Sequence, residues 1–283
     1  MRHPAVAGPF YPGTPATLQR AVDELLKNAR QELKASGPKS RPPFKAILCP
    51  HAGYVYSGLT AALSFAAAEK QLQLPNTTVI ILGPNHTGLG NPLSVSFEDW
   101  KTPVGTSSTD LPLAGAIIKS NAAITKNEAA HLAEHSIEVQ LPFLQTINPQ
   151  AKIVAICMGW QDDAMAKMLA KSIFDATRQK EFSDRNLLLL ASSDFTHYQS
   201  GEQARRLDAQ PLEFIKALQG TLFEEEVEAS DLSICGHGPI AVALHYSKLA
   251  GAKKAELLRY TNSGKETNGD EGQVVAYASF VIA

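Results

Sequence analysis

Leu187-Leu-Leu-Leu-Ala-Ser-Ser-Asp-Phe-Thr-His197 is the stretch that decides the fold of this 283-residue chain. Its apolar half runs without alternation, which is typical of a strand covered on both faces, as in a parallel sheet between helix layers. Three other short runs have the same character: Ala46–Cys49, Thr78–Leu82 and Lys152–Ile156. The sequence therefore predicts an α/β fold with a central, mainly parallel sheet that helices cover on both faces.

Segments with helical spacing or helix caps separate these strands. We expect helices over Pro15–Leu33, Gly58–Lys70, Pro112–Ser120, His135–Gln145, Asp162–Thr177, Gly201–Gln219 and Pro239–Ala250. Residues 87–112 favour a hairpin or flap, and two closing strands are expected at Glu256–Thr261 and Val274–Ile282. No internal repeat, long linker or low-complexity tract divides the chain, so we expect a single domain over residues 1–283.

Composition narrows the class of protein. The net charge of -2 gives no basic field that would attract nucleic acid or an anionic membrane. No stretch approaches the roughly 20 apolar residues of a membrane span, and Met1–Pro12 lacks the features of a signal peptide. The three cysteines are odd in number, widely spaced and free of any CxxC pair, which indicates a reducing compartment. We therefore expect a cytoplasmic protein without nucleic-acid or membrane partners.

Four apolar stretches each lead into a side chain that can bind metal or move protons. His51 follows Ala46–Cys49, His86 follows Thr78–Leu82, and Asp194 and His197 follow the leucine run. The fourth stretch, Leu232–Cys235, ends in a thiol. A buried strand places its last residues at the mouth of a sheet, so we expect one shared pocket. Imidazole and thiolate ligands suit iron, zinc or copper, and two imidazoles with one anionic ligand are an arrangement that non-heme iron uses.

Each candidate residue also has a plainer interpretation. A histidine after a strand can simply be a turn residue, and Cys235 competes as an inert buried thiol or a nucleophile. Asp194 and His197 have three possible interpretations. They form an acid/base pair, they orient a metal ligand, or Asp194 only caps the next helix.

Further polar residues near these stretches are open to two interpretations. Tyr54 and Tyr56 are candidate pocket walls or hydrogen-bond donors. Glu134 and His135 fit either the pocket or a helix cap, and His237 fits either a supporting donor or an exposed turn.

The same segments, read in order, resemble the Memo family. They are Pro50-His-Ala-Gly-Tyr-Val-Tyr-Ser-Gly58, Leu82-Gly-Pro-Asn-His86, Glu134-His-Ser-Ile-Glu138, Leu141-Pro-Phe143, Ser192-Ser-Asp-Phe-Thr-His197 and Cys235-Gly236, flanked by Ala7-Gly-Pro-Phe-Tyr-Pro12 and Thr261-Asn-Ser-Gly264. Bacterial and archaeal members of this family are called AmmeMemoRadiSam system protein B. The resemblance covers nearly the whole chain and implies a fold similar to the catalytic subunit of class III extradiol dioxygenases.

The resemblance also implies roles for individual residues. His51, His86 and Cys235 would be the metal ligands, with iron(II) as the first choice of metal and copper or zinc as alternatives. Asp194 and His197 would line the pocket, His197 at the position where the dioxygenases keep an acid/base histidine. Those enzymes have a carboxylate where this chain has Cys235, so the family name leaves the reaction open.

Two main classes of function follow. The first is a metal-dependent oxidoreductase or redox protein that acts on a small molecule, in a pathway that the resemblance links to a radical SAM protein and an AMMECR-type protein. The second is a module that binds a peptide or small anion in the same pocket without catalysis. A zinc hydrolase with Asp194 or His197 as base is a third interpretation.

Overall fold

A nine-stranded mixed sheet forms the centre of the molecule. The computed structural model describes residues 1–37, 40 and 42–283. The sheet has the order β10-β11-β1-β8-β2-β7-β3-β6, with β9 paired to β11. Its strands are β1 (Ala46–Cys49), β2 (Thr77–Pro84), β3 (Leu93–Val95), β6 (Ile124–Lys126), β7 (Lys152–Met158), β8 (Asn186–Ser192), β9 (His197–Gln199), β10 (Ala255–Asn262) and β11 (Val274–Ile282). A separate hairpin joins β4 (Trp100–Thr102) to β5 (Gly105–Ser107).

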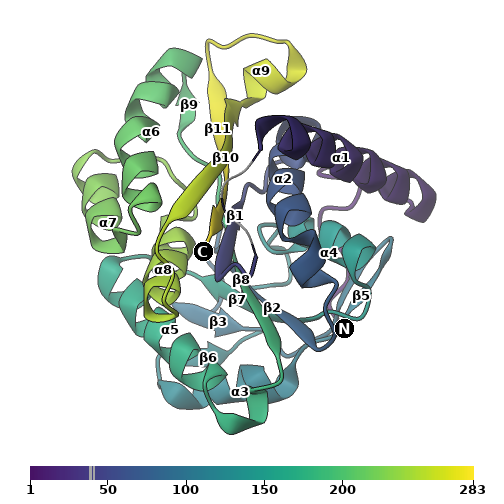
Figure 1. Cartoon of the computed structure of the whole chain (residues 1–283), viewed down its shortest axis with the longest axis vertical. Helices are drawn as coiled ribbons and strands as arrows, with labels where there is room; N and C mark the ends of the chain where they lie inside the picture. The colour runs from purple at the N-terminus through teal and green to yellow at the C-terminus, as the bar shows by residue number, and fades with distance from the viewer. Residues whose placement is uncertain (38–39, 41) are drawn as a thin grey trace.

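Helices cover both faces of this sheet, as the continuous apolar strands predict (Figure 1). One layer contains α1 (Pro15–Ser36), α2 (Tyr54–Leu72) and α4 (Leu141–Ile147), which the 3₁₀ turn η1 (Glu138–Gln140) precedes. The opposite side carries α3 (Leu111–Ser120), α5 (Asp163–Thr177), α6 (Gly201–Lys216), α7 (Gly220–Ala229) and α8 (His237–Leu249). A short helix α9 (Ser263–Thr267) and a 3₁₀ turn η2 (Lys180–Phe182) complete the elements.

Successive residues of the central strands pack into opposite cores. In β8, Leu189 and Ala191 belong to the core beneath α5 and α8, whereas Leu188 and Leu190 belong to the core beneath α1 and α2. Strands β1, β8, β2 and β7 run parallel to one another, and antiparallel neighbours extend both edges. The four central strands are therefore parallel, and β11 on one side and β3 on the other run opposite to them, while the edge strand β6 is parallel to β3.

Several sequence-based expectations about elements need correction. The helix expected over His135–Gln145 is the 3₁₀ turn η1 followed by α4, which ends at Ile147. Helix α2 begins at Tyr54 rather than Gly58; a Cβ at Gly58 would lie 2.9 Å from Leu25 Cδ1, so this glycine permits close packing of α1 on α2. Helix α7 was not expected from its Glu-rich sequence, and it buries Phe223 and Val227. The segment Leu232–Cys235 is not a strand but a turn that leads into α8.

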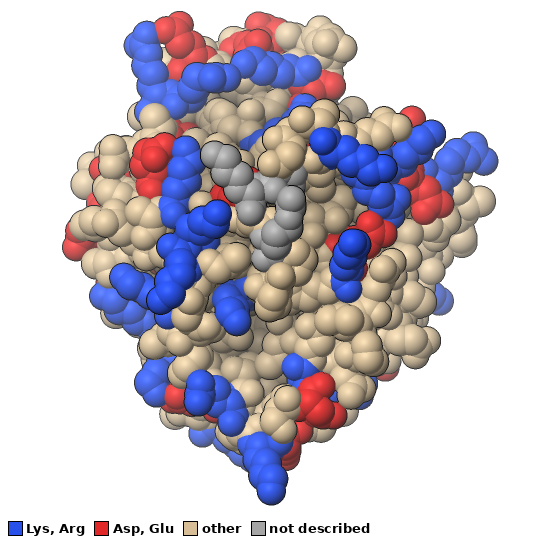
Figure 2. Space-filling model, in the orientation of Figure 1, with Lys and Arg blue, Asp and Glu red and all other residues tan. Residues whose placement is uncertain are grey.

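The surface is mixed in charge. Figure 2 shows one face, on which Lys and Arg predominate and Asp and Glu are interspersed among them. The whole chain has a net charge of -2. Within residues 1–37, 40 and 42–283, each helix is either too short or too polar to cross a bilayer.

Candidate metal centre

Three neighbouring parallel strands deliver the candidate residues to one edge of the sheet. Strand β8 lies between β1 and β2 and is parallel to both. His51 follows β1, Asp194 follows β8 and His86 follows β2. The carboxyl ends of adjacent parallel strands are the usual place for a ligand site in an α/β fold. The main chain thus gathers residues that are far apart in sequence.

His51, His86 and Cys235 lie close together at this edge. Each offers one ligand atom, and the three atoms lie within 4.8 Å of one another. His51 Nε2 is 3.2 Å from Cys235 Sγ, and the ring centroids of His51 and His86 are 5.2 Å apart. His51 is 2% exposed, and Cys235 is partly buried. Two nitrogens and one sulfur therefore converge within the span that a single metal ion bridges.

Gly236 allows the Cys235 turn to approach the end of β8. A Cβ at this position would lie 2.3 Å from Ser192 O and 2.7 Å from Ser193 Cβ, so only glycine fits. The Gly236 N–H donates to Ser193 Oγ over 2.9 Å, and the Asp194 N–H points at Cys235 Sγ over 3.3 Å. This close backbone contact holds the thiol beside the two imidazoles.

Hydrogen bonds fix the tautomer of His51. Gln140 Nε2 donates to Pro50 O and to Ser192 Oγ, each over 2.9 Å, and Ser192 Oγ donates its single hydrogen to Ser136 O over 2.7 Å. Ser192 Oγ can then only accept from His51 Nδ1, which lies 2.9 Å away. Nε2 of His51 therefore carries no hydrogen, and its lone pair is available on the side of Cys235 and His86.

Glu134 orients His86 in a similar way. Its carboxylate accepts from His86 Nδ1 over 2.9 Å and from the His86 N–H over 2.5 Å, as well as from the backbone N–H groups of His135 and Ser136. Burial raises the pKa of Glu134. The hydrogen bond from His86, the charge of a protonated His86, the Ser136 N–H and the charge of a protonated His135 outweigh burial, so the pKa falls to about 2. An ionised carboxylate thus holds Nδ1–H of His86 and leaves its Nε2 without a hydrogen, the arrangement that a metal-binding imidazole needs.

Two imidazoles of this cluster, those of His51 and His135, have lowered pKa values. Burial, followed by the neighbouring His135, His86 and His197, holds the pKa of His51 well below its ordinary value. Burial also lowers the pKa of His135 to about 4. The His135 ring stacks on His86 at a centroid distance of 4.5 Å and meets His51 edge-on at 5.4 Å. Neutral imidazole is the form that binds a metal ion, so the electrostatics suit one.

Asp194 and His197 both line the pocket beside these histidines. Burial raises the pKa of Asp194 to about 6, although the His51 N–H donates to its Oδ1 over 2.8 Å. His197 Nδ1 lies 2.8 Å from Ser233 O and donates to it, which leaves Nε2 as the proton acceptor of that ring. Burial, then the charge of Asp194, raises the pKa of the Cys235 thiol.

A pocket of about 480 Å³ opens above these residues. It is lined by Phe10, His51, Ala52, Gly53, Tyr56, His86, His135, Asp194, His197, Tyr198, Ser263, Val275 and Tyr277. Tyr56 and Tyr198 are 46% and 75% exposed and form part of its rim. Cys235 touches His51 but is not among the residues that line the pocket.

The amino-terminal segment closes one side of this pocket. Glu138 accepts from the Arg2 guanidinium, from the Ala5 and Val6 N–H groups and from Tyr11 OH. Phe10, carried by this segment, lies 4.7 Å from the His135 ring between centroids, and its carbonyl accepts from Tyr54 N over 2.8 Å. The pocket wall therefore depends on contacts that begin at Arg2.

Two candidate residues, Tyr54 and His237, neither line the pocket nor hydrogen-bond to its histidines. Tyr54 is buried in the core beneath α1 and α2, where its hydroxyl donates to Val139 O over 2.7 Å. His237 faces the other side of the Cys235 turn, with Nδ1 2.8 Å from Glu224 Oε2. Sequence reasoning missed Ser192 and Gln140, which set the His51 tautomer, and Phe10 and Tyr277, which line the pocket. Only the position of Ser192 at the end of a leucine run could have indicated its role.

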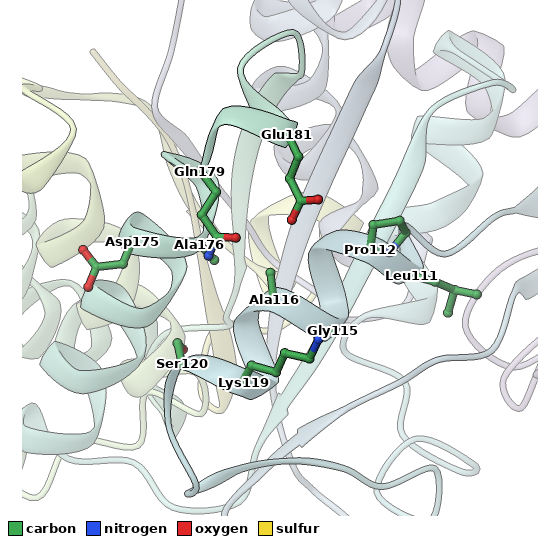
Figure 3. Close-up of a pocket in the computed structure, with 10 residues that line it drawn as sticks. All are labelled: Leu111, Pro112, Gly115, Ala116, Lys119, Ser120, Asp175, Ala176, Gln179 and Glu181. Atoms are coloured by element: carbon green, nitrogen blue, oxygen red, sulfur yellow. The ribbon is translucent and has the colours of Figure 1, made fainter.

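Another hollow, between α3 and α5, lacks the chemistry of this site. Figure 3 shows its lining, which extends from Leu111 to Ser120 and from Asp175 to Glu181. None of its ten described lining residues is a His or Cys. We therefore place the candidate metal centre in the histidine pocket.

Comparisons with known proteins agree with the fold and assign the family. A family model described as Memo-like protein matches residues 2–281. The MEMO1 family protein of Methanocaldococcus jannaschii is 42% identical over 294 residues, covering 100% of this chain and 99% of the relative. Those of Methanosarcina acetivorans and Archaeoglobus fulgidus are 40% and 41% identical, again covering 100% of this chain and 99% of each relative.

A solved structure shares the architecture at low sequence identity. The crystal structure of uncharacterized protein JW3007 from Escherichia coli K12 matches with a TM-score of 0.52 and 15% identity, covering 84% of this chain and 99% of that chain. This match supports the fold alone, whereas the family match and the archaeal relatives extend over the whole sequence. The chain belongs to the Memo family.

Proposed function

We propose that this chain is a cytoplasmic metal-binding redox protein, an oxidoreductase that acts on a small substrate in the histidine pocket. The observation that carries the proposal is the convergence of His51 Nε2, a His86 ring held by Glu134, and Cys235 Sγ. Iron(II) is the first candidate metal, and copper is the second, since a thiolate with two imidazoles suits either ion.

The donor set fits such an ion. His51 donates from Nδ1 to Ser192 Oγ, and His86 donates from Nδ1 to Glu134. The Cys235 thiol lies 3.2 Å from His51 Nε2. When bound, iron or copper would supply one-electron redox chemistry to the pocket. His51, His86 and Cys235 would hold the ion, and the thiol would have to release its proton on binding.

The remaining pocket residues would handle substrate and protons. Asp194, whose burial raises its pKa to about 6, can take up or release a proton near neutral pH. His197 Nε2 is a second acceptor, since Nδ1 donates to Ser233 O. Phe10 and Tyr277 would exclude water from one side of the bound molecule, and the exposed Tyr56 and Tyr198 would contact it at the rim.

Metal binding by ligand variants tests the proposal. Protein purified anaerobically and loaded with Fe(II) or Cu(I) is expected to hold about one ion per chain. Cys235→Ser and His86→Ala are expected to weaken affinity by more than the roughly 10–100-fold that loss of a supporting residue costs. His3→Ala, an exposed histidine, and Cys157→Ala, a buried cysteine of β7, serve as matched controls. Unchanged affinity in both ligand variants would rule out the assignment.

The exposed aromatic rim favours a binding module as the second candidate. Oxygen uptake in the presence of ascorbate distinguishes the two. Uptake that requires added iron or copper and disappears in Cys235→Ser supports the redox protein. Uptake no faster than that of free metal, together with ligand binding that needs no metal, supports a module that binds its ligand without catalysis.

A further inference from the structure

The fourth of the central parallel strands also directs a residue toward the metal centre. Strand β7 lies beside β2, and Gln161 follows it in the loop that leads to α5. The other three strands deliver His51, His86 and Asp194, whereas Cys235 belongs to the turn before α8. Gln161 contacts this turn, so all four parallel strands meet the site at the same edge of the sheet.

The side-chain amide of Gln161 bonds the Cys235 turn with both of its ends. Its Nε2 donates to Cys235 O over 3.0 Å, and its Oε1 accepts from the Gly238 N–H over 2.9 Å. This orientation of the amide gives each end a suitable partner, since Nε2 is a donor and Oε1 is an acceptor. Gln161 therefore joins the residue that carries the thiol to the first turn of α8.

The same contact satisfies an N–H group at the start of α8. The first N–H groups of a helix have no carbonyl partner within that helix, and Gly236, at the cap position of α8, has no side chain to bond them. A Cβ at Gly238 would lie 2.9 Å from Gln161 Cγ, so a glycine here lets the glutamine come close. Gln161 thus caps α8 from a neighbouring loop and fixes the turn at the same time.

The loop that carries Gln161 is itself held on both sides. Before Gln161, the N–H groups of Gly159 and Trp160 donate to Pro92 O over 2.8 and 3.3 Å. After it, Asp162 caps α5 by accepting a backbone N–H of its first turn over 2.7 Å. A side chain on a loop fixed in this way can hold another segment in place instead of following its movement.

The Cys235 turn is therefore tied to two strands. Ser193, after β8, accepts from the Gly236 N–H, and Gln161, after β7, donates to the Cys235 carbonyl. The thiol of the same residue lies 3.2 Å from His51 Nε2. A displacement of about 1 Å is enough to disturb a site of this kind, so the contacts of the turn decide whether the thiol can join the imidazoles.

We infer that Gln161 is a positioning residue of the candidate metal centre. It sets the place of Cys235 Sγ relative to the histidines and does not touch the ion. Its consequence for metal binding rests on the proposed function, whereas its hold on the turn depends on the fold alone. Loss of the Gln161 contacts should therefore be measurable with a metal and without one.

Cobalt(II) titration of the full chain provides the measurement with a metal. A thiolate bound to Co(II) gives a sulfur-to-metal charge-transfer absorption, which Cys235→Ser should abolish. In Gln161→Leu we expect this absorption to weaken and the affinity for Co(II) to fall about 10–100-fold, the usual cost of losing a residue that orients a ligand. Gln161→Glu keeps an acceptor for Gly238 but loses the donor to Cys235 O, and it should change the absorption in the same direction.

The reaction of Cys235 with dithionitrobenzoate provides the measurement without a metal. Cys49 and Cys157 are buried and Cys235 is partly buried, so the rate in the folded protein reports on Cys235. A turn that has lost two hydrogen bonds opens more often, so we expect Gln161→Leu to react about tenfold faster than the wild type at the same pH.

Gln71→Leu is the matched control. Gln71, in α2, bonds the backbone of Phe44 in the same two-ended way: Nε2 donates to Phe44 O over 3.0 Å, and Oε1 accepts from Phe44 N over 2.7 Å. Its loss should lower the melting temperature at least as much as loss of Gln161, because Gln71 is the more buried of the two. Both the cobalt absorption and the thiol rate should stay as in the wild type.

Failure of the proposed function and failure of this role give different results. If the wild type binds no Co(II), the proposed function fails, and the thiol reaction alone decides the role of Gln161. A wild-type thiol rate in both Gln161 variants, or an equal rise in Gln71→Leu, would overturn that role. An unchanged cobalt absorption in both Gln161 variants, when the wild type binds the ion, would overturn it as well.

Discussion

Glu134 is the residue on which the orientation of His86 depends. Its carboxylate is ionised and accepts from His86 Nδ1 and from three backbone N–H groups. Glu134→Gln preserves size but replaces one acceptor oxygen with a donor. We expect metal affinity to fall by about 10–100-fold, as for other residues that orient a ligand. Competition titrations with Fe(II) or Zn²⁺ measure this.

Glu128→Gln is the control for that substitution. Glu128 belongs to the same loop and also accepts hydrogen bonds, from Ser96 Oγ and Phe97 N, but it does not touch the histidines. Its variant should bind metal as the wild type does. Equal affinity in wild type and Glu134→Gln would show that His86 does not need this carboxylate.

Sequence reasoning reaches the residues that strands deliver and misses those that support them. His51 and His86 could be singled out because each follows an apolar run, and the structure brings both to one edge with Cys235. Their assignment as metal ligands stays a prediction. Ser192 also ends an apolar run, but its effect on His51, like that of Gln140, arises only from a hydrogen-bond chain between distant segments. A single sequence does not reveal which serine meets which glutamine.

At the scale of elements, the turn before α8 decides where Cys235 lies. Gly236→Ala places a Cβ where Ser192 O and Ser193 Cβ already lie, so the turn has to shift. We expect a loss of about 1–3 kcal/mol in unfolding free energy, typical of an overpacked site, together with weaker metal binding. Urea unfolding and metal titration measure the two effects.

Gly115→Ala is the matched control for this turn. No atom lies within 4 Å of a Cβ built at Gly115, which belongs to α3, so alanine there is expected to stabilise the helix by up to about 1 kcal/mol. If Gly236→Ala were as stable as the wild type and bound metal equally well, close approach of this turn to β8 would not matter.

The element boundaries show where local patterns lose their meaning. The apolar run Leu232–Cys235 has the composition of a buried strand, yet it forms a turn because Ile234 and Leu232 fill the core beneath α5 and α8 rather than pair with the sheet. The start of α2 was misplaced for a related reason, since Gly58 serves helix packing instead of ending a turn. Composition predicts burial better than it predicts the element that is buried.

At the scale of the whole molecule, a bound ion would join distant parts of the chain. His51, His86 and Cys235 come from three separate loops, so an ion held by them binds the folded state alone. At a free metal concentration 100 times the dissociation constant, stability should rise by about 2.7 kcal/mol, which corresponds to roughly 5–10 °C in Tm for a chain of this size. Thermal unfolding with and without Fe(II) under anaerobic conditions measures this shift, and Cys235→Ser should abolish it.

Asp208 links α6 to the sheet and makes the stability of the fold depend on pH. Its carboxylate accepts from Tyr260 OH over 2.6 Å and from Thr196 Oγ1 over 2.7 Å, and burial raises its pKa from 3.8 to about 6. A raised pKa means that this group favours the folded state fully below pH 3.8 and that the contribution is lost as pH rises through 6. The loss amounts to about 3 kcal/mol at most.

Asp208→Asn removes this dependence. Relative to the variant, the wild type is expected to lose stability between pH 4 and pH 7 in urea unfolding curves. Asp270→Asn, an exposed carboxylate, should follow the wild type at every pH. Parallel curves for wild type and Asp208→Asn would contradict the assignment.

The anchoring of the amino-terminal segment at Glu138 has a practical consequence for anyone who produces the protein. Arg2 is 3% exposed and in contact with this glutamate, and only a few residues separate it from Phe10 on the pocket wall. A protease that removes the first residues would therefore take away the anchor of this wall and disturb the histidine pocket, so intact mass should be checked before any assay of this site.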